Sequence, residues 1–214
     1  SVVNKDKLKE VIDSATNKGV SSRQSEIKHF LESNGIVAKS KIMLEIGEMI
    51  VKFGRTDLNV LITGDTGTGK KLVAKALHSI SRRAKNSFVT VDIPNIPREL
   101  FQSELFGHNK GSFSGAMSNK EGLFHQANAG TLFLDEIGDL SSELQSNLLL
   151  PIEEKSIRKV GSNSNESIDV RFVSATDKDL LAMMRDGNFR EQLFHRLREW
   201  ELQLPPLSAR TEDI

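Results

Sequence analysis

Apolar residues along the chain fall into short runs and into stretches with helical spacing, and the two patterns alternate. The runs, rich in β-branched and aromatic residues, predict buried strands over 58–63, 87–92, 131–135, 169–175 and 199–204. Between them, apolar residues three or four positions apart predict helices around 72–77, 144–154 and 178–185. Strands that alternate with helices favour a parallel sheet covered on both faces, so we predict a three-layer α/β/α fold. The polar segment 162–167 predicts an exposed loop between two strands.

The pattern differs before residue 35. Short helices are expected there, one ending near Gly19 and one that starts after Ser21 or Ser22 and ends at Asn34-Gly35. Their apolar positions are Leu8, Val11, Ile12 and Ala15 in the first, and Ile27, Phe30 and Leu31 in the second. These residues carry no candidate chemistry, so we interpret 1–34 as a helical linker or accessory extension and 35–214 as the domain.

The first helix of that domain is predicted to begin after Ser40, whose side chain is a good N-terminal cap, and to end at Gly54. Helical spacing predicts a buried stripe on this helix. Its members are Ile42, Ile46, Met49, Ile50 and Phe53.

Composition excludes several classes of protein. Lysine plus arginine and aspartate plus glutamate both total 29, so the formal charge is zero and gives no general attraction to nucleic acid or anionic membranes. Hydrophobic residues make up 37% and charged residues 27%, as in globular proteins. Cysteine is absent, which excludes disulfides, thiol catalysis and cysteine-ligated metals. No apolar run approaches the ~20 residues that span a bilayer and the N-terminus lacks a signal core, so we expect a cytoplasmic protein.

A glycine-rich segment follows the first predicted strand and opens a helix. It fits the P-loop pattern G-x-x-x-x-G-K, in which backbone N–H groups and the helix N-terminus face phosphate oxygens. Lys70 would reach the β- and γ-phosphates; the alternative is an ordinary glycine-rich turn. Lys71 stands where a serine or threonine usually meets Mg²⁺, and a cation cannot ligate a metal, so other groups must hold it. The expected nucleotide-binding residues are Gly64, Asp65, Thr66, Gly67, Thr68, Gly69, Lys70 and Lys71.

The strand 131–135 ends in two carboxylates. This is the Walker B arrangement, in which Asp135 would hold Mg²⁺ and Glu136 would orient and activate the attacking water. Acidic residues at a solvated strand end are the alternative. The P-loop upstream favours the catalytic interpretation.

Two further segments extend the candidate site. The strand ending at 173–177 carries polar residues that could sense the γ-phosphate, although spacing alone equally allows Thr176 or Asp177 to cap the following helix. Arg190 and Arg196 lie in the segment 189–196, and an arginine given to a neighbour's γ-phosphate stabilises transition-state charge. From their chemistry alone, both arginines are better interpreted as surface helix residues.

The run Ser103-Glu-Leu-Phe-Gly-His-Asn-Lys-Gly-Ser-Phe-Ser-Gly-Ala116 resembles the signature loop of bacterial enhancer-binding proteins, the AAA+ ATPase activators of sigma-54 RNA polymerase. Their hallmark is Gly-Ala-Phe-Thr-Gly-Ala after Glu-Leu-Phe-Gly-His. The resemblance covers roughly residues 35–214, including the closing Leu204-Pro-Pro-Leu-Ser-Ala-Arg-Thr-Glu-Asp-Ile214. The residues that match the hallmark are Gly111, Ser112, Phe113, Ser114, Gly115 and Ala116.

The resemblance implies an AAA+ P-loop fold, ATP hydrolysis with Mg²⁺, and a loop that contacts sigma-54 to remodel the closed promoter complex. Phe113 between flexible glycines suits a mobile tip whose burial on a partner contributes about 1.5–3 kcal/mol; packing back on its own domain is the alternative.

Matched positions carry the family's roles. Lys70, Asp135 and Glu136 would bind and hydrolyse ATP, and the resemblance makes Arg190 and Arg196 the pair that reaches a neighbouring subunit in a ring, usually a hexamer. Family members continue into a helical lid and a DNA-binding helix-turn-helix. The chain as given stops where the lid should begin, so we expect it to be monomeric, to hydrolyse poorly and to contact no DNA or membrane.

Departures from the family pattern open a second hypothesis. Lys71 stands for the usual glutamate, and Asp92 and Asp177 each replace an asparagine. An amide donates and accepts hydrogen bonds, whereas a carboxylate only accepts and repels phosphate. The chain could therefore be a nucleotide-binding switch or scaffold with weak hydrolysis. A kinase is a third possibility, but no acceptor pocket is evident and the signature loop would be unexplained.

Overall fold

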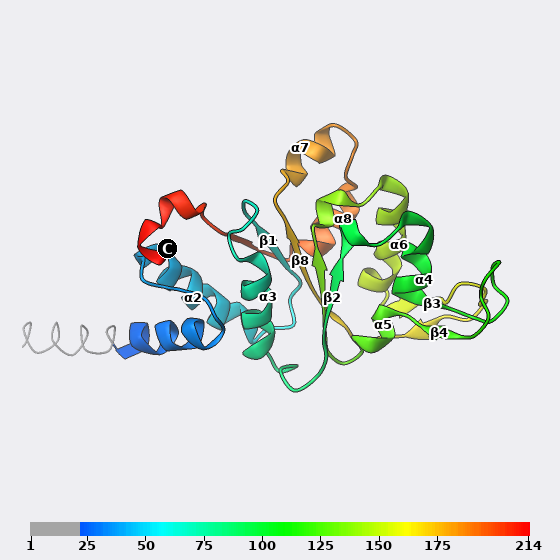
Figure 1. Cartoon of the computed structure of the whole chain (residues 1–214), viewed down its shortest axis with the longest axis horizontal. Helices are drawn as coiled ribbons and strands as arrows, with labels where there is room; N and C mark the ends of the chain where they lie inside the picture. The colour runs from blue at the N-terminus through cyan, green and yellow to red at the C-terminus, as the bar shows by residue number, and fades with distance from the viewer. Residues whose placement is uncertain (1–21) are drawn as a thin grey trace, which may run out of the picture.

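A computed structural model describes residues 22–214 (Figure 1), so the helix expected around 8–15 and its end near Gly19 lie outside the described residues. The helices are α2 (Lys41–Gly54), α3 (Lys70–Ser79), α4 (Arg98–Phe106), α5 (Leu123–Gln126), α6 (Ser142–Glu153), α7 (Leu180–Arg185) and α8 (Glu191–Leu197). The longer strands are β1 (Val60–Thr63), β2 (Phe88–Asp92), β5 (Thr131–Asp135), β8 (Arg171–Thr176) and β9 (Trp200–Gln203). The short strands are β3 (Gly107–His108), β4 (Lys120–Glu121), β6 (Ser156–Ile157) and β7 (Glu166–Ser167).

The five longer strands form one parallel sheet in the order β2-β5-β8-β1-β9. Each coincides with a predicted strand, and the prediction for β5 is confirmed to the residue. Because the strands are parallel, their carboxyl ends share one edge, where open α/β sheets bind ligands. Thr63, Asp92, Asp135 and Thr176 are the last residues of their strands.

Alternate residues of the sheet supply two separate cores. In β5, Leu132 and Leu134 face a cluster that includes α4, α5, α6 and α8, whereas Phe133 faces a cluster that includes α2 and α3. Figure 1 shows these helix groups on opposite sides of the sheet. The predicted three-layer α/β/α architecture is confirmed.

Helix α2 begins as predicted, with the Ser40 side chain accepting from the Met43 N–H at 3.3 Å. Its buried face is rotated from the predicted stripe. Ile42 and Met49, expected to be buried, are 39% and 37% exposed, whereas Met43 and Gly47 are buried.

The rotation follows from a neighbour that the stripe did not include. Residues 22–33 are helical and pack Ile27 and Leu31 against α2. A Cβ placed on Gly47 would lie 2.6 Å from a methyl carbon of Ile27, so the close approach requires glycine. The second predicted helix of the N-terminal segment is confirmed as an accessory helix of this core.

Short antiparallel pairs lie at the end of the molecule far from α2. They are β3–β4 and β6–β7, whose connecting loops project together on the right of Figure 1. The segment 162–167 is a loop as predicted up to Glu166, where β7 begins and pairs with β6. In the part of the chain from 22 to 214, no helix has the length and apolar character needed to cross a membrane.

Candidate functional site

The glycine-rich segment lies between β1 and the N-terminus of α3, as the P-loop pattern requires. Inside the loop, both the N–H and the hydroxyl of Thr68 donate to the Asp65 carbonyl, at 3.3 and 2.7 Å. Gly69 precedes α3 with φ +95°, a conformation suited to glycine. The loop is therefore a compact turn with a free helix N-terminus behind it.

Lys70 bends back over this turn. Its ammonium group is buried, donates to the Gly64 carbonyl at 2.9 Å and lies 3.3 Å from the Glu136 carboxylate. Glu136 follows β5 in a left-handed conformation, φ +55°, which an L-residue adopts at a cost. The P-loop lysine and the second Walker B carboxylate are thus joined in one ion pair.

Asp135 ends β5 beside Asp92, its register partner on β2. Burial, and then repulsion from Asp92, raise the pKa of Asp135 above its usual value, while Lys71 and Lys70 oppose the rise. One oxygen of Asp92 accepts from the Asn95 amide at 2.7 Å. The positive charge of Lys71 therefore offsets part of the effect that Asp92 has on the pKa of Asp135.

Asp177 connects the P-loop to the acidic pair. Its carboxylate accepts from the Thr66 hydroxyl at 2.7 Å, and its N–H donates to the Glu136 carboxylate at 3.2 Å. Helix α7 is instead capped by Asp179, which accepts from the Ala182 N–H at 3.0 Å. The alternative that Thr176 or Asp177 caps this helix is wrong, because β8 continues to Thr176 and moves the cap later.

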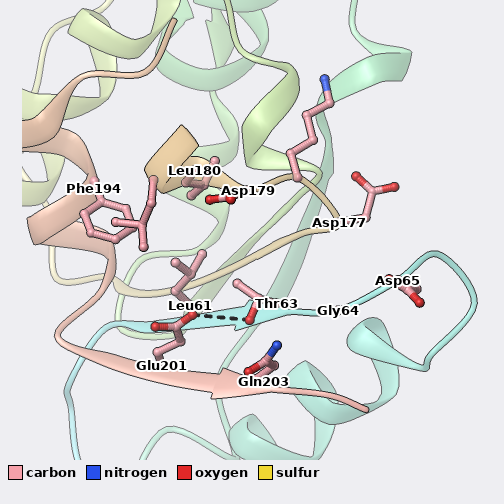
Figure 2. Close-up of a pocket in the computed structure, with 12 residues that line it drawn as sticks. Leu61, Thr63, Gly64, Asp65, Asp177, Asp179, Leu180, Phe194, Glu201 and Gln203 are labelled. Atoms are coloured by element: carbon pink, nitrogen blue, oxygen red, sulfur yellow. Dashed lines mark hydrogen bonds between the residues drawn. The ribbon is translucent and has the colours of Figure 1, made fainter. Parts of the chain in front are cut away.

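A cavity of about 310 Å³ lies beside the P-loop, between its first residues, α7 and the sheet edge (Figure 2). Gly64, Asp65 and Asp177 line one side, and Phe194 and Glu201 line the other. Figure 2 also shows the hydrogen bond from Thr63 to Glu201, 3.3 Å long. Neither Lys70 nor Asp135 lines this cavity, so it adjoins the phosphate turn without containing it.

The two candidate arginines contact other groups of their own chain. Arg190 donates to the Ser142 carbonyl at 3.1 Å, and Arg196 pairs with Glu153 at 2.9 Å. Both are exposed, and no hydrogen bond joins them to residues 64–71 in the described part of the chain. A single chain therefore does not bring them to its own P-loop.

The segment 109–119 connects β3 to β4 and carries the signature residues. Gly111 (φ +81°) and Gly115 (φ +103°) both adopt left-handed conformations, and the Gly111 N–H donates to the Ala116 carbonyl at 2.8 Å. Phe113 is 40% exposed, and its ring contacts His108 edge-on at 5.0 Å. It thus touches its own domain, as the alternative held, yet keeps a large exposed surface.

The neighbouring loop supports this segment from one side. Gly161 packs so closely on Ser112 that a Cβ at 161 would lie 2.5 Å from the Ser112 Cβ. Backbone hydrogen bonds join Val160 to Gly107 and Asn109 at 2.9 and 3.1 Å. Sequence analysis missed this pairing, because it joins residues about fifty positions apart with no shared periodicity.

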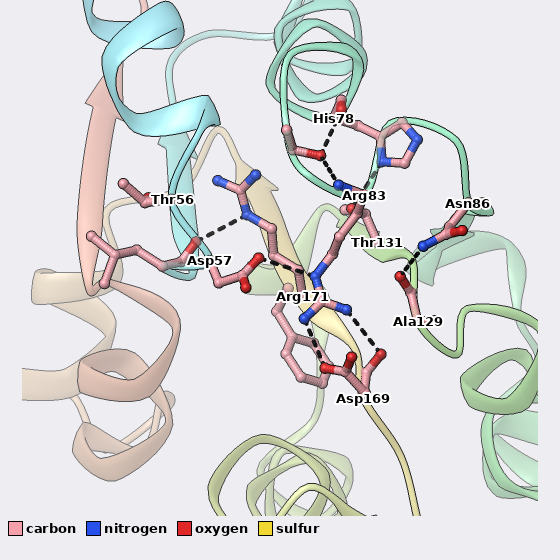
Figure 3. A network of polar contacts seen from close by, with 12 residues as sticks. Thr56, Asp57, His78, Arg83, Asn86, Ala129, Thr131, Asp169 and Arg171 are labelled. Carbon is pink, nitrogen blue, oxygen red and sulfur yellow. Dashed lines mark hydrogen bonds and ion pairs between the residues drawn. The ribbon is translucent and has the colours of Figure 1, made fainter.

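A polar network at the opposite edge of the sheet has a structural role (Figure 3). Arg83 binds Asp57 at 3.1 Å and Asp169 at 2.7 Å. Arg171, fully buried, donates to the carbonyls of Gly54 and Leu58. These contacts fix the end of α2 to the sheet and lie away from the strand edge that carries the P-loop.

Comparison with known proteins agrees with this geometry. Residues 36–203 match the family described as the Sigma-54 interaction domain. The chain is 42% identical over 212 residues to the transcriptional regulatory protein GlrR of Escherichia coli (strain K12), covering 99% of this chain and 47% of that protein. It is 48% identical over 179 residues to the DNA-binding transcriptional regulator NtrC of Azospirillum brasilense, covering 84% and 37%. The chain therefore spans less than half the length of these curated relatives.

Solved structures give the same result. NtrX from Brucella abortus in complex with ATP matches with a TM-score of 0.77 and 33% identity, over 100% of this chain and 45% of that one. The P-loop NTPase domain of a sigma-54 transport activator from E. coli matches with a TM-score of 0.51, over 80% of this chain and 99% of that one. Its 20% identity supports the fold alone.

Proposed function

This chain belongs to the Sigma-54 interaction domain family and has the AAA+ P-loop NTPase fold, and from that premise we propose that it hydrolyses ATP to remodel the sigma-54 RNA polymerase closed complex. The observation that carries the proposal is one connected set of contacts. At the carboxyl edge of the sheet, hydrogen bonds link Thr66 to Asp177 and Asp177 to Glu136. An ion pair then links Glu136 to Lys70. These are the groups that ATP hydrolysis requires: a phosphate turn, a cation and a general base.

In this proposal, the backbone of residues 64–69 and the N-terminus of α3 bind the phosphates. Lys70 leaves Glu136 to contact the β- and γ-phosphates, which releases the Glu136 carboxylate to accept a proton from water. The ion pair between them supports this exchange, since both partners already lie at the site.

Mg²⁺ fits the donor set at the end of β5. Asp135 would hold it through a carboxylate oxygen, the ligand type that Mg²⁺ prefers, and Lys71 supplies no ligand. When bound, Mg²⁺ neutralises charge on the phosphate oxygens. Asp92 lies beside Asp135 and tunes its protonation through repulsion.

Arg190 and Arg196 act on a neighbouring subunit in this proposal. Both are exposed, and their side chains contact α6, Arg190 at the Ser142 carbonyl and Arg196 at Glu153. An arginine placed on a partner's γ-phosphate stabilises the transition state, so the active form is a ring, usually a hexamer.

The exposed loop supplies the contact to sigma-54. Phe113 lies between Gly111 and Gly115 with 40% of its surface exposed, and it would bury that surface on the partner. DNA contact would belong to a helix-turn-helix domain outside these residues, since a chain with zero net charge has no general attraction to the DNA backbone.

A switch with weak hydrolysis is the second candidate, and Asp177 favours it. Its carboxylate accepts the hydrogen bond of the Thr66 hydroxyl, so that hydroxyl is not free to bind phosphate. It also adds negative charge beside the phosphate turn, and both effects weaken ATP binding.

Steady-state ATP hydrolysis at increasing protein concentration tests the proposal, with Lys70→Met as the inactive control. A rate per subunit that rises with concentration is the expected result, because the arginines act across subunits. Nucleotide binding without turnover at any concentration would favour the switch, and phosphoryl transfer to an acceptor other than water would favour a kinase.

A further inference from the structure

The last ten residues return to the P-loop. The segment 205–214, which we term the brace, lies against α2 (red in Figure 1). Two of its residues, Arg210 and Asp213, make buried polar contacts with the rest of the domain. The hydrolysis scheme above uses neither residue.

Asp213 anchors the brace to the start of α2. Its carboxylate accepts from the backbone N–H groups of Lys39 and Ser40 at 2.6 and 2.8 Å, and from the Ser40 hydroxyl. Burial alone would raise its pKa, but these hydrogen bonds hold the pKa of Asp213 below its usual value. The residue that caps α2 is therefore itself held by the brace.

Arg210 reaches from the brace into the phosphate turn. Its guanidinium is buried, donates to the Thr68 carbonyl and contacts the Met43 sulfur at 3.1 Å. The contact to Thr68 joins residues 142 positions apart in the sequence. Its Nε–H is buried and has no hydrogen-bond partner among residues 22–214.

The contact between Arg210 and the Thr68 carbonyl fixes the orientation of the peptide unit that joins Thr68 to Gly69. In a trans peptide, the C=O and the N–H of the same unit point in opposite directions. Arg210 fixes the Thr68 carbonyl on the side of the brace, so the Gly69 N–H points the other way, at the start of α3. That N–H is among the donors that a helix N-terminus offers to phosphate.

We propose that Arg210 is a positioning residue for nucleotide binding, which sets the direction of the Gly69 N–H through the Thr68 carbonyl. The inference rests on the proposed function, since it assumes that the turn binds phosphate. It adds a connection: the brace joins the start of α2 to the phosphate turn through Asp213 and Arg210.

Arg210→Lys tests the proposal, because lysine keeps the positive charge but lacks the planar fork that fixes the carbonyl direction. The matched control is Arg171→Lys, another buried arginine that donates to backbone carbonyls but lies far from the P-loop. The readouts are the dissociation constant for ADP and the change in the Gly69 amide chemical shift when ADP is added.

We expect Arg210→Lys to bind ADP about tenfold more weakly, with a smaller Gly69 shift change. Arg171→Lys should lose stability in denaturant yet bind ADP within about twofold of wild type. Wild-type affinity and an unchanged Gly69 shift in Arg210→Lys would overturn the inference while leaving the proposed function intact. A wild-type chain that binds no ADP would instead overturn the proposed function, and the inference with it.

Asp213→Asn is the second variant, needed if Arg210→Lys does not fold. It loosens the brace at its other anchor and keeps Arg210. Weaker ADP binding with a reduced Gly69 shift change supports the inference, and unchanged values of both overturn it.

Discussion

The molecule carries two glycine-rich loops, 64–70 and 109–119, and they are held in opposite ways. Hydrogen bonds hold the first loop from several sides. Lys70 donates to its first carbonyl, Asp177 accepts from its Thr66 hydroxyl, and Arg210 donates to its Thr68 carbonyl. The second is supported on one flank by the loop that carries Gly161, and its aromatic tip touches one ring, His108.

Glycine therefore serves two purposes in one fold. In the first loop it permits a tight turn whose N–H groups are fixed before a ligand arrives, which lowers the entropy cost of binding. In the second it leaves an exposed aromatic on a segment with few contacts, which suits docking on a partner. The two loops should consequently fail separately when mutated.

The largest effect is expected from Lys70→Met. Loss of the cation that faces the phosphates should weaken ATP binding by about a hundredfold or more, since hydrogen bonds to charged groups are strong. Titration calorimetry with ATP measures it. Lys75→Met, on the exposed face of the same helix, is the control, and an equal loss there would remove the special role of Lys70.

Glu136→Gln should separate binding from chemistry in the same region. The amide cannot take a proton from water, so hydrolysis should fall about a hundredfold or more, whereas ATP binding should persist because Lys70 is released from its ion pair. Single-turnover hydrolysis with labelled ATP measures the change. A variant that hydrolyses at the wild-type rate would exclude Glu136 as the base.

Phe113→Ala should impair the proposed function of the second loop, sigma-54 binding, and leave that of the first loop unchanged. Its exposed ring surface would contribute about 1.5–3 kcal/mol when buried, so sigma-54 affinity should fall roughly tenfold to a hundredfold. ATP hydrolysis should stay within about twofold of wild type. Met117→Ala is the control, since Met117 is 86% exposed on the same loop. Loss of hydrolysis with sigma-54 binding intact would reverse the assignment of the two loops.

The smallest effect concerns pH at the first loop. Burial, and then repulsion from Asp92, raise the pKa of Asp135, so this carboxyl keeps its proton to a higher pH. It ligates Mg²⁺ only at a pH above that raised pKa, where it is ionised. Asp92→Asn should therefore move the acid limb of the hydrolysis profile to lower pH. Asp186→Asn, an exposed substitution at the C-terminal end of α7, should leave the limb in place.

The same shift carries a stability consequence with a defined sign. A carboxyl whose pKa is raised in the folded state binds its proton more tightly there, so stability falls as pH rises from the ordinary pKa through the raised one. Asp92→Asn should reduce that fall. Thermal denaturation of wild type and Asp92→Asn is measured at neutral pH and at a pH well below the ordinary carboxyl pKa. A difference in melting temperature that is larger at the acidic pH would contradict the account.

Local pattern predicted the strands, the P-loop and the cap of α2, because these depend on neighbouring residues. β5 was predicted to the residue, since its apolar run ends sharply at Asp135. The buried face of α2 was predicted less well, because a second helix packs at Gly47 and rotates the stripe.

Contacts between distant residues could not be predicted. Asp213 meets Ser40 across 173 positions, and neither periodicity nor motif spacing relates the two. The capping of α7 by Asp179 was also missed, because several nearby polar residues suit a cap and the choice depended on where β8 ends.

The central claim is that ATP bound at the first loop drives work on sigma-54 through the second loop, and sigma-54 affinity in different nucleotide states tests it most directly. Binding of labelled sigma-54 is measured with wild type and Phe113→Ala, each with ADP and with a non-hydrolysable ATP analogue. We predict that wild type binds sigma-54 differently in the two states and that Phe113→Ala binds weakly in both. Equal wild-type affinity in both states, or full affinity in Phe113→Ala, would contradict the account.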